Sequence, residues 1–228
     1  MRIVILTGAG ISAESGLSTF RDKGGIWSRY DLKDLATPEA FARNPAFVHE
    51  FYNMRRANVR KAKPNPAHES LARLEKNYPG EVTLVTQNVD DLHERAGHSR
   101  VIHMHGRHGS ALCAECGHRW EAPEVMRVED PCPACGRPAT RPDVVWFGEI
   151  PYHMDEILGA LARADLFVAI GTSGTVYPAA GFVAQARETG SRTLELNLES
   201  SAQTRLFDET RTGPATEIVP QWVDEMLA

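Results

Sequence analysis

The sequence predicts an α/β protein with a Rossmann-like, doubly wound parallel sheet. Four short apolar runs, at residues 2–7, 82–87, 166–171 and 193–198, have the length and composition of buried strands. Helical patterns lie between these runs, and such alternation is typical of a sheet covered by helices. The 228 residues suffice for one large domain that carries smaller inserts.

Five segments have a helical pattern. Residues 44–59 should form a helix with Pro45 near its start and with Phe47, Phe51 and Met54 on one side. A second helix should open at Asn65, as the N-cap before a proline at the first helical position. The other helices are expected at 153–165, at 178–189 with a glycine cap at Gly190, and at 221–228.

Composition and charge exclude several classes of protein. The chain has 25 Lys and Arg against 30 Asp and Glu, a formal charge of −5, which argues against direct nucleic-acid binding by bulk electrostatics. The longest apolar runs reach only six residues, whereas a membrane span needs about 20. No secretory h-region follows Met1, so a cytoplasmic location away from the membrane is expected.

A glycine-rich turn follows the first predicted strand. Gly8-x-Gly10-x-x-Ala13 would let the backbone turn tightly and approach a pyrophosphate beside a helix N-terminus, although an ordinary strand–turn remains the plainer interpretation. No acidic residue ends a second strand about 20 positions later, as a dehydrogenase fingerprint requires. This absence argues against a plain NAD-dependent dehydrogenase.

All four cysteines lie in one polar stretch as two CxxC pairs. Cys113 and Cys116 are separated by 15 residues from Cys132 and Cys135, which is the spacing of a zinc ribbon. Four thiolates form a closed tetrahedral site, so the predicted zinc ion is structural. Disulfides and free thiols are the disfavoured alternatives in a cytoplasmic chain.

Two histidines lie close together in the segment 103–106. If this segment is extended, His103 and His105 lie on the same side, and one of them can act as a general base near neutral pH. The alternative is a structural histidine with satisfied hydrogen bonds. That alternative is expected for the other seven histidines, at positions 49, 68, 93, 98, 108, 118 and 153.

Polar residues follow each of the four predicted strands. They comprise Gly10, residues 86–90, residues 171–173 and residues 197–199. The carboxyl ends of the strands of a doubly wound sheet share one rim, where ligands bind. The sequence therefore predicts a site for ribose and phosphate groups at this rim.

Tyr52 and Arg55 are three residues apart on a predicted helix and so share one face. Arg55 begins a basic run that extends to Lys63, which by itself is typical of a solvated surface. The more specific interpretation is a carboxylate site, in which arginine supplies paired donors and tyrosine one more.

Taken together, these motifs resemble the sirtuin family of NAD-dependent protein lysine deacylases. The matching segments cover nearly the whole chain: residues 8–21, 86–97, 103–106, the paired CxxC motifs, 144–149, 171–181 and 197–199.

The resemblance implies a role for each group of site residues. His105 would be the general base, with Asn88 and Asp90 as catalytic partners, and the four cysteines would bind zinc. NAD would contact Gly8, Ala9, Gly10, Ser12, Phe20, Arg21, Trp27, Gln87, Asn88, Val89, Asp90, Gly171, Thr172, Ser173, Asn197, Leu198, Glu199 and Ala215. The acyl-lysine channel would be lined by Val144, Val145, Trp146 and Phe147.

One departure from the commonest pattern of the family bears on acyl specificity. Thr19 stands where many deacetylase-type members have Asp, and this variant is similar to the class III branch. There Tyr52 and Arg55 would hold the free carboxylate of succinyl- or malonyl-lysine, and Ala36 would widen the pocket.

The resemblance also implies the reaction. Acetyl, succinyl or malonyl groups would pass from protein lysine to ADP-ribose, giving nicotinamide, O-acyl-ADP-ribose and free lysine. A protein mono-ADP-ribosyltransferase that uses the same cleft is the alternative enzyme, and a zinc-ribbon binding module is the non-enzymatic one. The partners would be acylated lysine side chains, and the chain is expected to be a monomer.

The two inserts predict how the chain divides into domains. Residues 1–27, 65–106 and 144–228 would form the Rossmann-like NAD-binding domain. Residues 28–64 would form a helical insert and residues 107–143 a zinc-binding insert, and together these would build a small second domain.

Overall fold

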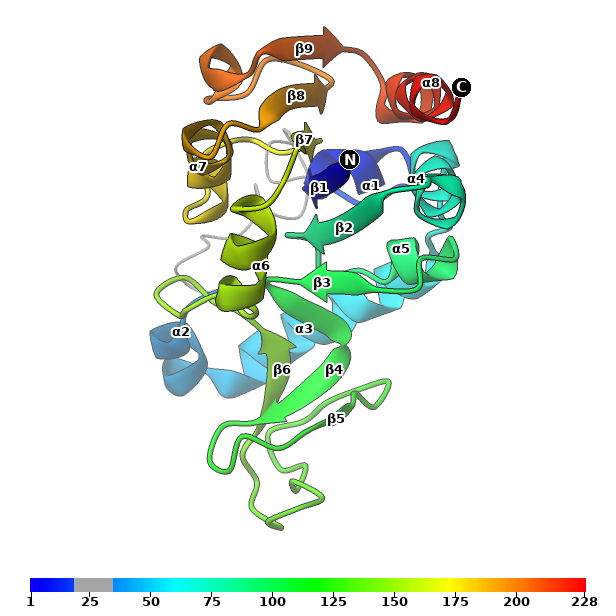
Figure 1. Cartoon of the computed structure of the whole chain (residues 1–228). Helices are drawn as coiled ribbons and strands as arrows, with labels where there is room; N and C mark the ends of the chain where they lie inside the picture. The colour runs from blue at the N-terminus through cyan, green and yellow to red at the C-terminus, as the bar shows by residue number, and fades with distance from the viewer. Residues whose placement is uncertain (19–34) are drawn as a thin grey trace.

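The computed structural model describes residues 1–18 and 35–228. Its main element is a six-stranded parallel sheet in the order β3-β2-β1-β7-β8-β9 (Figure 1). This order confirms the predicted Rossmann-like fold class. The strands are β1 (Arg2–Thr7), β2 (Glu81–Thr86), β3 (Val101–His103), β7 (Leu166–Ile170), β8 (Arg192–Asn197) and β9 (Glu209–Thr212).

Four of these strands match the predicted ones to within about one residue, and the two edge strands were not predicted. β1 and β7 are buried almost throughout, which explains their unbroken apolar sequences. β3 has only three residues, and β9 has the polar sequence ETRT with no residue fully buried. An edge strand of this kind carries no apolar signal.

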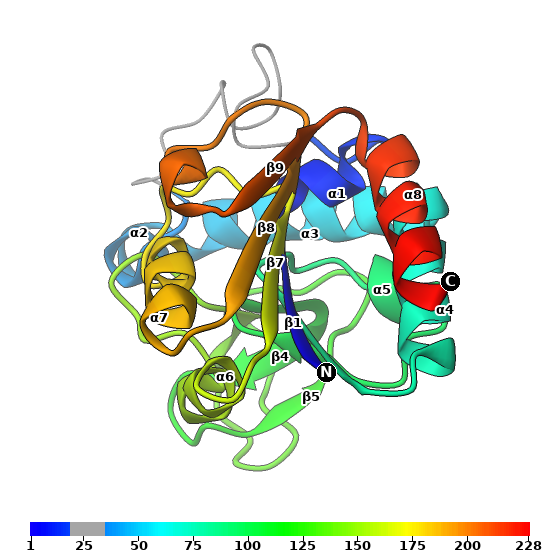
Figure 2. The ribbon, with the colours of Figure 1, turned by 45° about the horizontal axis from the view of Figure 1, so that its top comes forward.

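Helices cover both faces of the sheet (Figure 2). α4 (Pro66–Asn77) and α8 (Ala215–Leu227) lie on one face, and α6 (Met154–Leu161) and α7 (Phe182–Glu188) lie on the other. Along β1, Ile3 and Ile5 belong to the core on the face covered by α4 and α8. Val4 and Leu6 belong to the core on the face covered by α6 and α7. The alternation of side chains along the strand therefore builds two cores from one apolar run.

The start of α4 agrees with its predicted cap. Asn65 Oδ1 accepts hydrogen bonds from the backbone N–H groups of Ala67 at 3.0 Å and His68 at 3.4 Å. The His68 ring accepts in turn from the Asn65 N–H at 3.3 Å, which completes a capping box. The predicted cap at Gly190 also agrees with the structure, since this residue has φ of +85° just after α7.

Two other helix predictions needed correction. α6 ends at Leu161 instead of Asp165. The C-terminal helix α8 begins at Ala215, six residues before the predicted start, and continues through Pro220. The buried side chains of this helix before and after the proline pack against the sheet, and this packing outweighs the local cost of proline: Ile218, Val219, Trp222 and Val223.

The segment between β1 and α4 contains α1 (Ala9–Ala13), α2 (Pro38–Arg43) and α3 (Pro45–Lys61). Asn44 caps α3 by accepting from the Phe47 N–H at 3.2 Å. Met54, which was predicted on the same side of α3 as Phe47 and Phe51, is 37% exposed, so that side of the helix is buried only in part. The apolar residues on the buried side of α3 are Val48, Phe51, Tyr52 and Val59.

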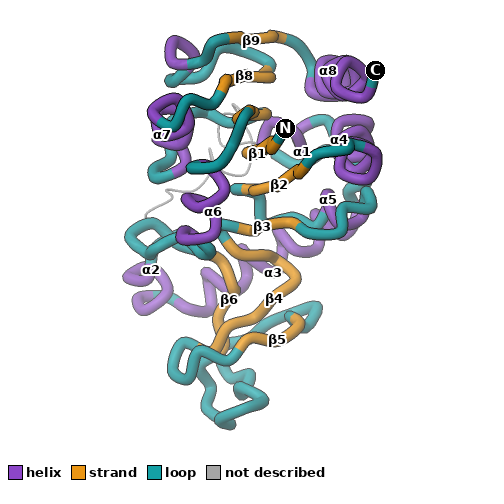
Figure 3. The backbone as a smooth tube through the Cα atoms, viewed as in Figure 1, coloured by secondary structure: helices purple, strands orange, loops and turns teal. Residues whose placement is uncertain are grey.

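A three-stranded antiparallel sheet in the order β5-β4-β6 lies below the main sheet in Figure 1. Its strands are β4 (Gly106–Cys113), β5 (Arg119–Glu121) and β6 (Thr140–Val144). A short turn joins β4 to β5, and a long loop joins β5 to β6 (Figure 3). The short helices α5 (Leu92–Arg95), η3 (Ala179–Gly181) and η4 (Thr204–Leu206) complete the elements of the described ranges. None of the helices in these ranges has the length and apolar character needed to cross a bilayer.

Candidate functional site

The strand order of the main sheet reverses between β1 and β7, and ligands of doubly wound sheets bind at such a point. The turns that follow these two strands touch there. The Gly8 N–H donates to the Ile170 carbonyl at 2.9 Å, and the Gly10 N–H donates to the Gly171 carbonyl at 2.8 Å.

This contact gives a physical reason for the glycines. A Cβ on Gly10 would lie 2.7 Å from the Gly171 Cα and 2.8 Å from its carbonyl oxygen. Gly171 has φ of +61°, a conformation that side chains disfavour. The sequence argument assigned the glycines to the approach of a ligand, but the neighbouring turn already requires them.

A buried polar network joins the glycine turn to the segment after β2. Asn88 Nδ2 donates to the Gly8 carbonyl and to Ser12 Oγ, both at 3.1 Å. Ser12 Oγ donates to Asp90 Oδ2 at 3.1 Å, and Asp90 Oδ1 accepts from the Leu92 N–H at 3.1 Å. Burial raises the pKa of Asp90, although the hydrogen bonds from Leu92 and Ser12 oppose the shift. The network fixes four predicted site residues against one another: Gly8, Ser12, Asn88 and Asp90.

Further along the rim, Thr172 connects two predicted site residues. Gln87 Nε2 donates to Thr172 Oγ1 at 3.1 Å, and Asn197 Nδ2 donates to the Thr172 carbonyl at 2.8 Å. The polar residues that follow β2, β7 and β8 therefore meet at the rim, as expected from parallel strands.

The other predicted cofactor residues are more dispersed. Leu198 is 66% exposed, and Glu199 next to it is also exposed. Ser173 exchanges a hydrogen bond of 2.8 Å with Thr175, and Ala215 is the first residue of α8. Ala9 is the first residue of α1, and Val89 is half-buried beside Asn88. Phe20, Arg21 and Trp27 lie outside the described residues, as does Thr19.

The two histidines of the segment 103–106 have different environments. The segment is not extended throughout, because β3 ends at His103 and His105 lies in a turn, so the condition for the two histidines to share one side is not met. His103 Nε2 contacts Glu94 at 2.7 Å, and its Nδ1 contacts the Asn88 carbonyl at 3.2 Å. Both nitrogens of His103 are thus occupied, which indicates a structural role.

Among the described residues, His105 has a hydrogen-bond partner at one ring nitrogen only. Its Nδ1 lies 3.1 Å from the Gln87 carbonyl, and because a carbonyl can only accept, Nδ1 carries the hydrogen. Nε2 is then the basic nitrogen. Burial lowers the pKa of His105, while the hydrogen bond to Gln87 opposes the shift. The ring is therefore neutral near pH 7 and suited to accept a proton.

The segment 144–147 lies between His105 and α3. The Val145 N–H donates to the His105 carbonyl at 2.9 Å, and the Phe147 N–H donates to the Ala36 carbonyl at 2.9 Å. Val144 is buried, whereas Phe147 is 48% exposed. Hydrogen bonds therefore connect the predicted channel segment to His105, the predicted base, and to Ala36, a predicted pocket residue.

Tyr52 lies on α3 against the same segment. Its hydroxyl oxygen accepts from Trp146 Nε1 at 2.9 Å, and the side chain is only 6% exposed. Burial raises the pKa of Tyr52 to about 12, so the hydroxyl keeps its hydrogen. Burial lowers the pKa of Arg55, while Tyr52 and Asp90 oppose the shift. Arg55 therefore remains a cation between the tyrosine and the rim.

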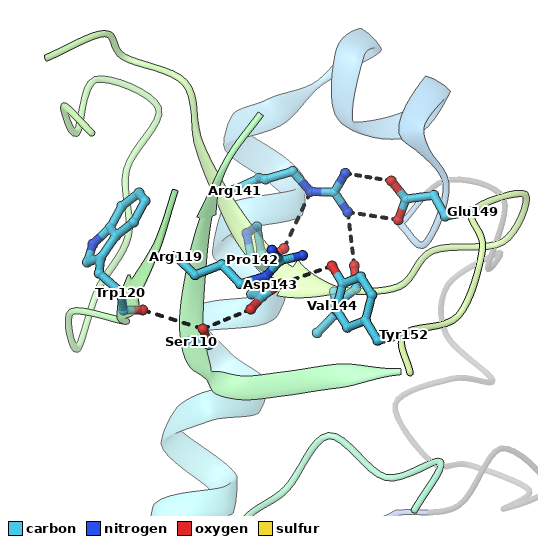
Figure 4. Close-up of polar contacts among 9 residues, drawn as sticks. All are labelled: Ser110, Arg119, Trp120, Arg141, Pro142, Asp143, Val144, Glu149 and Tyr152. Carbon is cyan, nitrogen blue, oxygen red and sulfur yellow. Dashed lines mark hydrogen bonds and ion pairs between the residues drawn. The ribbon is translucent and has the colours of Figure 1, made fainter. Parts of the chain in front are cut away.

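An ion pair that the sequence analysis missed supports this segment (Figure 4). Arg141 binds Glu149 through two hydrogen bonds, at 2.7 and 3.0 Å. Glu149 also accepts from the Trp146 N–H at 2.8 Å, and the Arg141 guanidinium lies 3.5 Å from the centre of the Trp146 ring. No motif signalled this pair, because its residues belong to a strand and a loop that only folding brings together.

Asp143 holds β6 to its neighbours (Figure 4). It accepts hydrogen bonds from Ser110 Oγ at 2.8 Å, from Arg119 Nε at 3.2 Å and from the Tyr152 hydroxyl at 2.9 Å. These bonds fix the strand that leads into the segment 144–147.

The four cysteines gather at one point of the second sheet and its loops. Their sulfur atoms all lie within 4.8 Å of one another, and Sγ of Cys113 lies 3.7 Å from Sγ of Cys135. A tetrahedral ion with Zn–S bonds of about 2.3 Å would separate its ligands by about 3.8 Å. The glycines after each pair, Gly117 and Gly136, have φ of +72° and +73°. The site therefore fits one structural zinc ion.

Several other histidines are buried, and not all have the partners expected of structural histidines. His93 Nε2 lies 3.0 Å from Thr7 Oγ1, and His49 Nε2 lies 3.1 Å from the Thr140 carbonyl. In contrast, neither ring nitrogen of His108 has a hydrogen-bond partner among the described residues, so the expectation is wrong for this residue. His118 and His153 are exposed.

The chain is similar to proteins of known family along its whole length. The model of the family described as "Sir2 family" matches residues 8–178. An "NAD-dependent protein deacylase" of Caulobacter vibrioides is 58% identical over all of this chain and 98% of its own length. A protein of the same description from Bdellovibrio bacteriovorus is 53% identical over 99% of this chain and 96% of its own.

Solved structures agree with these matches. A Sir2 homologue in complex with NAD superposes with a TM-score of 0.89 at 39% identity, covering 99% of this chain and 89% of that one. A complex of Sir2 with a p53 peptide and NAD superposes with a TM-score of 0.83 at 29% identity, covering 98% of this chain and 92% of that one.

Proposed function

The chain belongs to the Sir2 family, and on that premise we infer that it is an NAD-dependent protein deacylase that acts on acylated lysine side chains. The observation that carries this inference is a full-length relative of that description at 58% identity, combined with a neutral His105 beside the rim of the sheet. The relatives are named deacylases, so the alternative mono-ADP-ribosyltransferase is not favoured.

NAD would bind across the switch point between β1 and β7. The residues that would hold it are those of the glycine turn, residues 87–90, residues 171–173, residues 197–199 and Ala215. When bound, NAD supplies the ribose that accepts the acyl group. Asn88 and Asp90, fixed through Ser12, would orient the ribose and the nicotinamide amide.

His105 would remove a proton from a ribose hydroxyl. The hydrogen bond from Nδ1 to the Gln87 carbonyl leaves Nε2 as the proton acceptor and keeps the ring from rotating. Because burial lowers its pKa, His105 would become protonated only at a lower pH than an ordinary histidine.

The acyl-lysine would enter beside residues 144–147. The N–H groups of Val145 and Phe147 donate to the carbonyls of His105 and Ala36. The peptide backbone would pair along this segment as an added strand. The Arg141–Glu149 pair keeps the segment in place. Zinc, held by the four cysteines, would stabilise the adjoining loops without taking part in the reaction.

We further propose that negatively charged acyl groups, succinyl and malonyl, are good substrates. Arg55 supplies a partly buried cation, and the Tyr52 hydroxyl, which accepts from Trp146, retains its own hydrogen for a carboxylate. Ala36 leaves space where a larger side chain would narrow the pocket. The division of the chain into domains, a cytoplasmic location and a monomeric state remain predictions.

The experiment compares succinyl-, malonyl- and acetyl-lysine versions of one peptide, with NAD, by mass spectrometry of nicotinamide and peptide. We expect NAD-dependent removal of all three groups, and loss of at least about 100-fold in turnover for His105→Ala. Arg55→Met should lose succinyl activity and retain acetyl activity. Absence of any NAD-dependent deacylation would refute the activity, whereas equal losses on both acyl groups in Arg55→Met would refute only the carboxylate site.

A further inference from the structure

His108 lies on β4 between α3 and the segment that follows β2. Its N–H donates to the Val89 carbonyl at 2.7 Å, and its own carbonyl accepts from Arg56 Nε at 2.9 Å. Its ring meets the Tyr52 ring edge to face, with centroids 5.9 Å apart and planes at 60°. The backbone of His108 is therefore held on both sides, and its ring adjoins the proposed carboxylate site.

The polar atoms of this ring have no hydrogen-bond partner in the part of the chain that the structure describes. His108 is 3% exposed, and neither Nδ1 nor Nε2 has a hydrogen bond among the residues that the structure describes. Nη2 of the neighbouring Arg56 is buried and unpartnered as well. Buried polar atoms are paired in the great majority of cases, so such a cluster indicates a missing acceptor.

The surroundings of the ring are cationic. Burial, with the positive charges of Arg55 and Arg56, holds the pKa of His108 well below its ordinary value. The neutral imidazole therefore has one N–H to donate. Asp90 is the carboxylate that acts on Arg55, and it already accepts from Ser12 and Leu92. Among the described residues, the two ring nitrogens of His108 and Nη2 of Arg56 thus remain buried without a hydrogen-bond partner.

We propose that His108 is a specificity-determining residue of the deacylase, which donates from its ring to the terminal carboxylate of a dicarboxylic acyl group beside Tyr52 and Arg55. The inference rests on the proposed carboxylate site and deepens it. A carboxylate has two oxygens with about four acceptor positions, enough for the phenol, the guanidinium and the imidazole together. An acetyl group offers none of these acceptors beyond its carbonyl.

The test measures kcat and KM on succinyl and acetyl versions of one peptide. His108→Leu should raise KM for the succinyl peptide about tenfold, since it removes a hydrogen bond to a charged group, and should leave kcat/KM for the acetyl peptide within about twofold. His108→Gln keeps a donor and should lie between the wild type and His108→Leu. Arg107→Leu is the matched control on the exposed side of the same strand, and we expect no change.

The outcomes separate the two claims. If the wild type does not remove succinyl groups, the proposed carboxylate site is refuted, and this inference with it. If the wild type does so but His108→Leu changes both peptides equally, or neither, only this inference is overturned.

A second measurement applies if His108→Leu does not fold. His108→Gln keeps a donor at a similar side-chain volume, so it decides the inference in that case: KM for the succinyl peptide should rise about threefold, while acetyl kcat/KM stays within about twofold. Equal changes on both peptides, or no change on either, would overturn the inference.

Discussion

The indole Nε1 of Trp146 donates a hydrogen bond of 2.9 Å to the hydroxyl oxygen of Tyr52, which lies 94 residues earlier in the chain. Both side chains are buried, at 2% and 6% exposure. The Arg141 guanidinium lies over the Trp146 ring, 3.5 Å from its centre. Helix α3 and the segment 144–147 are therefore fastened together at the point where we expect the acyl group to bind.

Removing the Tyr52 hydroxyl should weaken both the fold and the recognition of charged acyl groups. Tyr52→Phe leaves Trp146 Nε1 buried without an acceptor, and we expect the free energy of unfolding to fall by about 1–3 kcal/mol in urea. Succinyl kcat/KM should fall about tenfold and acetyl kcat/KM less than about threefold. The half-buried Tyr78 has no recorded hydrogen bond from its hydroxyl in the described part of the chain, so Tyr78→Phe is the control. A stable Tyr52→Phe with unchanged acyl preference would contradict this account.

A methyl group at Gly10 should separate the two turns at the switch point. The added Cβ meets backbone of Gly171 at 2.7 Å, so we expect Gly10→Ala to lower the free energy of unfolding by about 1–3 kcal/mol and to weaken NAD binding. In Gly159→Ala, the new Cβ meets only the end of the Arg163 side chain at 3.6 Å, within α6. The free energy of unfolding of that variant should equal that of the wild type or exceed it by up to about 1 kcal/mol. Thermal unfolding and NAD titration of both variants provide the measurement, and equal stabilities would show that the turns can move apart.

Zinc should be present at one ion per chain and should be lost with any one of its ligands. Cys132→Ser removes a buried thiolate, and we expect zinc analysis by mass spectrometry to find little metal. Limited proteolysis should then cut within residues 114–139 before the main sheet. Glu115→Ala changes an exposed residue next to Cys116 and should retain the metal. Full zinc content in Cys132→Ser would exclude a four-thiolate site.

The buried histidines should make the fold sensitive to acid. Burial lowers the pKa of His68 to about 4 and lowers those of His93 and His98 as well. The unfolded chain takes up protons near pH 6.5 while the folded chain does not, so stability is complete above that pH and falls below it. Each histidine contributes up to about 1.4 kcal/mol per pH unit, for His68 until about pH 4.

Urea unfolding at pH 7.5, 6.5 and 5.5 measures this effect. His98→Gln removes one titrating group, so the fall in stability between pH 6.5 and 5.5 should be shallower than in the wild type. The exposed His153 has φ of +59°, which asparagine tolerates, so His153→Asn is the control and should keep the steeper fall. A wild type equally stable at pH 7.5 and 5.5 would contradict the assignment.

The local parts of the fold could be predicted because their signals are local. The unbroken apolar runs of β1 and β7 indicate strands that are buried on both faces. Asn65 and the proline after it indicate the start of α4. The spacing of the two CxxC pairs predicted a thiolate cluster, which the structure brings within 4.8 Å. The start of the C-terminal helix was not predicted correctly, because tertiary packing decides whether a helix continues through a proline such as Pro220.

By itself, the sequence determined the fold class, the family resemblance and the residue types available for chemistry, since motifs and periodicity depend on neighbours along the chain. Only the tertiary structure decided how these residues are used. It distinguishes His105 from His103 by their partners and gives Gly10 its close contact with Gly171. It also places the His108 ring, whose nitrogens have no partner within residues 1–18 and 35–228, beside Tyr52. Hydrogen bonds, clashes and desolvation act between atoms that are distant in sequence, and the fold alone brings those atoms within reach.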